Sequence, residues 1–119
     1  MSTFPEAVLE HFRNPRHSGE LESATHRAEV TNPVCGDVLR LAARVEDGRI
    51  IEARFLCRGC TTAIACASWL TERLTGLSVE EARGLNVATI SNALGGLPEE
   101  TMHGAHLAAD AVRALLKNK

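Results

Sequence analysis

Aromatic side chains and any strong excess of charge are both missing from this chain. Aromatic residues make up 3% of the sequence and tyrosine is absent, so no surface for stacking nucleic-acid bases is expected. The formal net charge is only −2, with acidic and basic residues interspersed, which does not favour nucleic acid or an anionic membrane as a partner. No carboxylate pair, nucleophile–base pair or phosphate-binding glycine motif points to an enzyme.

Long hydrophobic runs are missing as well. No apolar stretch approaches the roughly 20 residues needed to cross a bilayer. The opening residues, Met1 to Glu6, do not have the basic-then-apolar layout of a signal peptide. We therefore expect a cytoplasmic protein without membrane association. Its 119 residues suit one domain, 1–119, with a modest hydrophobic core.

The first half of the chain predicts a helix followed by a small sheet. Apolar residues recur every four positions at Phe4, Val8 and Phe12, which is the spacing of one helical face. Strands are expected at residues 27–31, 38–45 and 50–56. In the third strand, apolar residues alternate with polar ones, which predicts a buried face formed by Ile51, Ala53 and Phe55. The Asp47-Gly48 pair suits a tight hairpin turn, so we expect a three-stranded antiparallel sheet.

The second half of the chain predicts helices. A helix is expected from Thr61 until Gly76 ends it, and Ser78 has the signature of the cap of a short helix. Another short helix is expected at 87–94, and the last helix is expected to begin at Pro98. Since strands come first and helices follow, the fold is expected to be α+β, with the helices packed on the sheet.

Four cysteines in a chain without an export signal indicate metal binding or reactivity rather than cross-links. Cys35 lies in a loop stiffened by Pro33 and Gly36, and Asp37 lies on the same side of the backbone if the chain there is extended. Cys66 is expected to be a small buried residue.

The second candidate thiol, Cys60, comes just before a helix, where free amides and the helix dipole favour a thiolate. His103 lies near the start of the last helix. If these ends of elements converge, a tetrahedral donor set is formed by Cys35, Asp37, Cys60 and His103. Thiolates and imidazole are typical ligands of zinc and of iron–sulfur units, while a carboxylate is a harder, weaker ligand that would leave a cluster easy to release.

Each of these residues alone also has an ordinary structural explanation. Asp37 is typical of a turn residue that accepts backbone hydrogen bonds. A single histidine such as His103 is more often a surface or capping residue than a ligand. The spacing of Cys57 and Cys60 also fits thiol–disulfide exchange, but the alternating strand–helix pattern of a thioredoxin is missing.

Several blocks in this sequence resemble the scaffold family for iron–sulfur cluster assembly, the IscU and NifU N-terminal-like proteins. They are, in order, Val8 to Arg16, Asn32-Pro33-Val34-Cys35-Gly36-Asp37, Gly59 to Ser68, and Leu97-Pro98 leading to His103 and Leu107 to Ala111. The likeness covers nearly the whole chain. It implies a protein that builds a labile cluster, expected to be a 2Fe–2S cluster, and passes it to apo-proteins.

By position, the resemblance makes Cys35 and Cys60 the first cluster ligands, Asp37 the labilising carboxylate and His103 the family histidine. It implies a pyridoxal-phosphate cysteine desulfurase as the source of sulfur and recipient apo iron–sulfur proteins as further partners. It also implies that Zn²⁺ occupies the same site when no cluster is present.

Two departures from the family pattern matter. The family's third cysteine would directly follow His103, where this chain has Gly104. Cys57 and His106 are the candidate replacements. Relatives that use a dedicated chaperone pair carry a Leu-Pro-Pro-x-Lys signal, and here Pro98 is followed by two glutamates, which makes that interaction doubtful.

The missing thiolate keeps two further functions open. A set of two cysteines, a histidine and an aspartate is a plausible zinc site, so the chain is alternatively a zinc-bound sulfur acceptor or a regulator of a desulfurase. It is otherwise a degenerate paralogue that keeps the fold and only binds partners.

Overall fold

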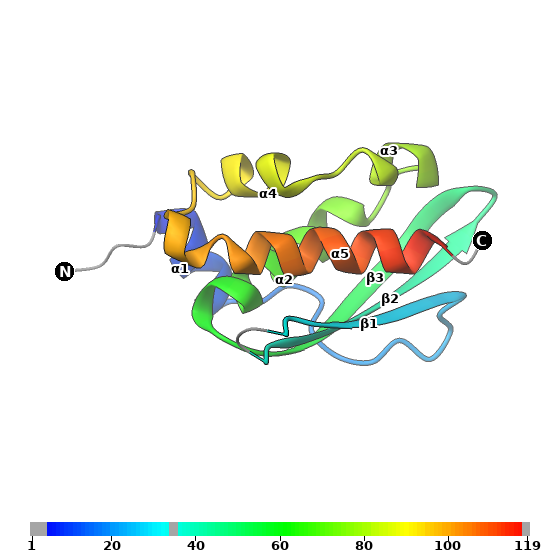
Figure 1. Cartoon of the computed structure of the whole chain (residues 1–119). Coiled ribbons are helices and arrows are strands. Elements are labelled where there is room, and N and C mark those ends of the chain that lie inside the picture. Colours follow the sequence, from blue (N-terminus) through cyan, green and yellow to red (C-terminus); the bar gives the residue numbers. More distant parts are fainter. Residues whose placement is uncertain (1–4, 34–35, 118–119) are drawn as a thin grey trace.

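The computed structural model describes residues 5–33 and 36–117 (Figure 1). The elements in chain order are α1 (Glu6–Arg13), β1 (His26–Thr31), β2 (Val38–Glu46), β3 (Arg49–Arg58), α2 (Thr61–Leu74), α3 (Val79–Arg83), α4 (Val87–Ala93), η1 (Glu99–Thr101) and α5 (His103–Lys117). In these ranges the strands form a three-stranded antiparallel sheet in the order β1-β2-β3. The predicted α+β fold is confirmed.

The β2–β3 hairpin closes at the predicted turn, but a bulge changes which residues of β3 face inward. Asp47 and Gly48 have positive φ angles of 54° and 74°, as a tight hairpin turn requires. Arg44 pairs with Glu52 but Val45 pairs with Ile50, so Ile51 is an extra residue in β3. Ile50 is therefore fully buried and Ile51 is 38% exposed. The expectation that Ile51 faces the core is wrong.

The helices cover one face of the sheet. In Figure 1, α2 and α5 lie directly against the strands, and α3 and α4 lie on the far side of α5. Helix α5 packs on β1 and β2, and α2 packs on β3. The core between these layers contains fully buried side chains from both, among them Leu39, Leu41, Leu70 and Leu115. Within the described ranges, no helix is long and apolar enough to span a bilayer.

The last helix begins later than the sequence predicts. Pro98 has an extended backbone, with φ −58° and ψ 150°, and a short 3₁₀ turn follows it. The amides of Thr101 and Met102 each bond the carbonyl three residues earlier. Regular α-helical structure then starts at His103, not at Pro98. His103 is consequently the first residue of α5 and lies at an end of the helix.

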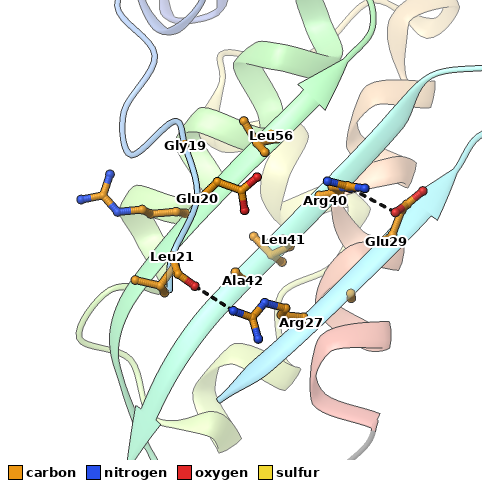
Figure 2. Close-up of a pocket in the computed structure, with 11 residues that line it drawn as sticks. Gly19, Glu20, Leu21, Arg27, Glu29, Arg40, Leu41, Ala42 and Leu56 are labelled. Atoms are coloured by element: carbon orange, nitrogen blue, oxygen red, sulfur yellow. Dashed lines mark hydrogen bonds and ion pairs between the residues drawn. The ribbon is translucent and has the colours of Figure 1, made fainter. Parts of the chain in front are cut away.

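The opposite face of the sheet carries charged residues beside apolar ones, and two of its arginines bond to groups of the same chain (Figure 2). The segment after α1 bonds to the edge of β3 near Ser18 and then crosses this face, leaving a hollow of about 360 Å³. At its rim, the Arg27 guanidinium donates to the Leu21 carbonyl at 3.0 Å. Arg40 pairs with Glu29 at 3.1 Å. These arginines are therefore already engaged by groups of the same chain.

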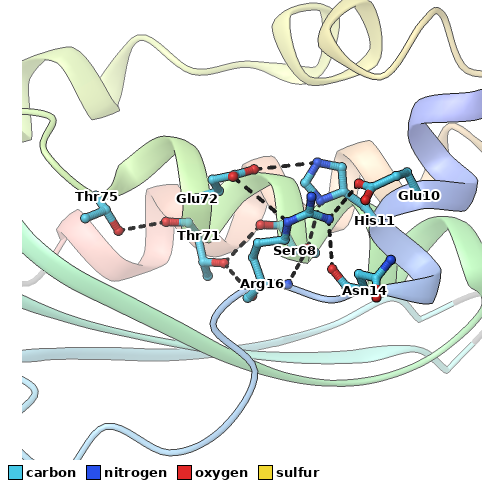
Figure 3. A network of polar contacts seen from close by, with 8 residues as sticks. All are labelled: Glu10, His11, Asn14, Arg16, Ser68, Thr71, Glu72 and Thr75. Carbon is cyan, nitrogen blue, oxygen red and sulfur yellow. Dashed lines mark hydrogen bonds and ion pairs between the residues drawn. The ribbon is translucent and has the colours of Figure 1, made fainter.

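A buried polar network fixes the segment after α1 against α2 (Figure 3). The Ser68 hydroxyl accepts the Arg16 amide proton at 2.8 Å and lies 2.8 Å from His11 Nδ1. On the other side of the ring, His11 Nε2 lies 3.7 Å from the Glu72 carboxylate. This serine–histidine–carboxylate order has the connectivity of a hydrolase triad, but Ser68 is 0% exposed. Because no substrate can reach the hydroxyl, the network's role is to hold the fold.

The pH dependence of stability should report on His11. Burial, aided by the Arg16 guanidinium, lowers the pKa of His11 below its usual 6.5. The unfolded state then binds a proton more readily, so the free energy of unfolding should fall as the pH drops below about 6.5 and level off below the folded-state pKa. Urea unfolding between about pH 8 and pH 5 measures this change.

The control for that experiment is His11→Gln, which keeps a hydrogen-bonding side chain but cannot titrate. The variant should show a flatter pH profile in this range. The pKa values of Glu10 and Glu81 are also lowered from 4.5, so protonation of these carboxylates changes the free energy of unfolding only at lower pH. If the free energy of unfolding changed with pH equally in the native protein and in His11→Gln, the change could not be assigned to His11.

Candidate metal centre

Asp37, Cys60 and His103 meet at one end of the sheet. One donor atom from each side chain lies within 4.8 Å of the others. Cys60 Sγ is 3.1 Å from His103 Nε2, and the same nitrogen is 3.8 Å from Asp37 Oδ2. The Asp37 side chain is 13% exposed and that of His103 30%, while Cys60 is exposed. The group is thus a shallow cluster of a thiol, an imidazole and a carboxylate that solvent and partners can reach.

Asp37 is placed by a turn immediately before β2. Gly36 has a positive φ of 79°, and its amide donates to the Asn32 carbonyl at 2.8 Å. The Asn32 amide in turn donates to the Asp37 carbonyl at 2.8 Å. The backbone therefore turns at Gly36, immediately before Asp37. Cys35, the fourth predicted donor, lies outside the described residues.

Cys60 is the residue that caps the start of α2. Its backbone is extended, with φ −79° and ψ 173°, and its carbonyl accepts the Ile64 amide at 3.1 Å as the first bond of the helix. The Cys60 amide donates to Asp37 Oδ2 at 3.4 Å. The helix start thus places the thiol and helps to hold the carboxylate.

Gly59 makes room for that carboxylate. A Cβ atom at position 59 would lie only 2.8 Å from Asp37 Cγ and 2.9 Å from Asp37 Oδ2, closer than real contacts allow. Sequence reasoning did not single out Gly59. The feature of the sequence that could have indicated its role is a glycine directly before Cys60, at the junction of a strand and a helix.

The distances fit a metal ion after a small movement. With zinc bonds of about 2.3 Å to sulfur and about 2.0–2.1 Å to nitrogen, tetrahedral geometry separates the two ligand atoms by about 3.6 Å. The observed distance of 3.1 Å between Cys60 Sγ and His103 Nε2 is that of a hydrogen bond. Binding would replace this hydrogen bond with two bonds to the metal and move the side chains apart by a few tenths of an ångström.

The candidate replacements for a third thiolate are not in this group. Among the described residues, Cys57 and His106 do not belong to the cluster of donor atoms. Cys57 is half-buried and packs against the core, and burial, with smaller effects of Asp37 and Cys60, raises the pKa of its thiol to about 12. His106 is exposed on the next turn of α5. Cys66 is fully buried in the core, as expected.

The chain was compared with known protein families and proteins. Residues 3–118 match the family model of the NifU-like N terminal domain, so the chain belongs to that family. The "Iron-sulfur cluster assembly scaffold protein IscU 1" of Archaeoglobus fulgidus is 43% identical over 110 residues, which are 92% of this chain and 72% of the relative. The "Iron-sulfur cluster assembly enzyme IscU" of Drosophila melanogaster is 38% identical over 120 residues, covering 98% of this chain and 77% of the relative.

A solved structure shows the same fold. The crystal structure of a NifU-like N-terminal protein from Brucella abortus matches with a TM-score of 0.76 at 18% identity, over 94% of this chain and 90% of that one. The predicted membership of the IscU and NifU-like family is confirmed.

Gly59→Ala should displace the Asp37 carboxylate, because the new methyl group would lie 2.8 Å from Asp37 Cγ, 2.9 Å from Oδ2 and 3.1 Å from Cβ. We expect Zn²⁺ affinity, measured by calorimetric titration under reducing conditions, to fall by roughly tenfold, as for other changes that disturb the support of a metal ligand. The matched control is Gly84→Ala, where the nearest atom to an added Cβ is 3.4 Å away. Equal Zn²⁺ affinity in both variants would show that Asp37 is not part of the site.

Proposed function

We propose that this protein is a scaffold or carrier for iron–sulfur cluster assembly. It holds a labile 2Fe–2S cluster as cargo on Cys35, Asp37, Cys60 and His103 and passes it to apo-proteins. The observation that carries this proposal is the convergence of sulfur, nitrogen and oxygen donors from distant parts of a chain in the NifU-like family. The names of the curated relatives support the same function.

The mixed donor set suits temporary binding. Thiolate and imidazole match the softness of iron–sulfur units, whereas the Asp37 carboxylate is a hard ligand with weaker affinity for them. Its bond would be the first to give way when a competing thiolate approaches. Cys60 is exposed, so the thiolates of a recipient protein can reach the cluster and replace the scaffold's ligands one at a time. Easy release is what a carrier requires.

The exposed Cys60 thiol also supports the partners in this proposal. We assign a pyridoxal-phosphate cysteine desulfurase as the source of sulfur and apo iron–sulfur proteins as the recipients, in the cytoplasm. The Drosophila relative is named an assembly enzyme and the Archaeoglobus relative a scaffold protein. For this chain we assign binding and release, without a catalytic group.

A zinc-bound sulfur acceptor or desulfurase regulator is the second candidate. It is favoured by the small number of thiolates near the centre. Position 104 is glycine, and Cys57 does not belong to the group of converging donor atoms among the described residues. Cys35 and Cys60 with one histidine and one carboxylate form a donor set that Zn²⁺ accepts.

Anaerobic reconstitution with Fe²⁺, cysteine, a reductant and a cysteine desulfurase tests the scaffold function. The native protein should acquire a visible chromophore and acid-labile sulfide, and Cys60→Ala should lose most of both. Cys66→Ala is the matched control, because Cys66 is 0% exposed and burial raises the pKa of its thiol to about 12. Cys66→Ala should therefore retain the chromophore.

The outcomes separate the candidate functions. A colourless native product without sulfide would reject the scaffold. In that case, one equivalent of tightly bound zinc that is lost in Cys60→Ala would support the second candidate. Desulfurase binding by a protein that takes up neither metal would identify a degenerate, partner-binding paralogue. A full chromophore in Cys60→Ala would show that the cluster is held elsewhere.

A further inference from the structure

Helix α5 approaches the first turn of α2 very closely at Gly104. An added Cβ at Gly104 would lie 3.0 Å from the Thr62 methyl carbon and 3.1 Å from both the Ala63 nitrogen and the Thr62 carbonyl carbon. The last two are backbone atoms in the first turn of a helix, so they cannot rotate away. A side chain at this position would require the two helices to move apart.

The close approach lies between two residues of the candidate metal centre. Gly104 directly follows His103, and Thr62 is two residues after Cys60. His103 Nε2 and Cys60 Sγ are 3.1 Å apart. His103 is the first residue of α5 and Cys60 caps the start of α2, so a displacement of the two helices at Gly104 moves both donors, in addition to the small side-chain movement that metal binding itself requires.

Thr62 shows that this contact depends on packing. Its side chain is 1% exposed, and its hydroxyl has no hydrogen-bond partner among the described residues. Van der Waals contact, including that of the methyl group with Gly104, is therefore what holds the side chain in place. Such a contact is sensitive to the addition of a single carbon atom.

We propose that Gly104 is a positioning residue of the metal centre. The missing side chain lets α5 approach α2 closely enough to bring the His103 imidazole onto the Cys60 thiol. This inference rests on the proposed function, and it gives the departure from the family pattern at this position a structural role. In this chain, position 104 supplies close packing where the family pattern supplies a ligand.

The test compares Gly104→Ala with Gly84→Ala in the purified, reduced protein, using Co²⁺ alone as the probe. Alanine is the better helix former, so Gly104→Ala would stabilise the protein if no close contact existed. We expect Gly104→Ala to bind Co²⁺ at least tenfold more weakly than the native protein does, and to unfold at a lower temperature. Gly84→Ala, with its nearest atom at 3.4 Å, should bind Co²⁺ like the native protein.

The ligand-field spectrum distinguishes positioning from a general loss of stability. It is recorded at saturating Co²⁺, at a temperature at which circular dichroism shows every variant to be folded. Gly104→Ala should shift the d–d bands because the donor geometry changes, and Gly84→Ala should not. Adding Thr62→Ser to Gly104→Ala removes the methyl contact at 3.0 Å and should restore part of the affinity.

Native affinity and a native spectrum in Gly104→Ala would overturn the proposal, as would an unfolding temperature above that of the native protein. Failure of the native protein to bind any Co²⁺ would instead refute the proposed function. The two failures are therefore distinguishable in one experiment.

Discussion

The candidate metal centre depends on the packing of two helix starts against each other. The first turns of α2 and α5 meet at Thr62 and Gly104, and this contact places Cys60 beside His103. The core holds both helices in place, because α2 packs on β3 and α5 on β1 and β2. The hydrophobic core therefore determines the geometry of an exposed polar site.

The site combines a carboxylate that is fixed in place, Asp37, with an exposed thiol, Cys60. Asp37 rests over Gly59 and accepts a hydrogen bond from the Cys60 amide, and its Oδ2 atom also lies 3.8 Å from His103 Nε2. Cys60 itself is exposed. Rigid placement favours binding, and exposure together with a hard oxygen ligand favours release. A carrier needs both properties, whereas a permanent redox centre would be expected to bury its ligands.

Local sequence patterns predict most of the fold and the donors that meet. The alternation in β2, the Asp47-Gly48 turn and the start of α2 at Thr61 are all signalled by neighbouring residues, and the structure confirms them. The bulge at Ile51 could not be predicted, because a single extra residue changes strand register without changing composition. The start of α5 at His103 was also missed, since a 3₁₀ turn and an α-helix begin with similar residues.

The contacts of Gly59 and Gly104 lie further beyond the reach of sequence reasoning. Each joins segments that are distant along the chain, Gly59 to Asp37 and Gly104 to Thr62. A glycine in a sequence does not show which atoms occupy the space of its missing side chain. Cys57 illustrates the same limit, because its spacing from Cys60 suits a ligand while its burial favours the protonated thiol.

X-ray absorption at the metal edge most directly tests whether sulfur, nitrogen and oxygen donors share one metal centre. The sample is protein purified without oxygen, measured at the iron edge or, if zinc is bound, at the zinc edge. We expect a first coordination shell that contains sulfur together with nitrogen or oxygen. A shell without sulfur would contradict this, because Cys60 would not hold the metal, and so would a shell of sulfur alone, because Asp37 and His103 would not be ligands.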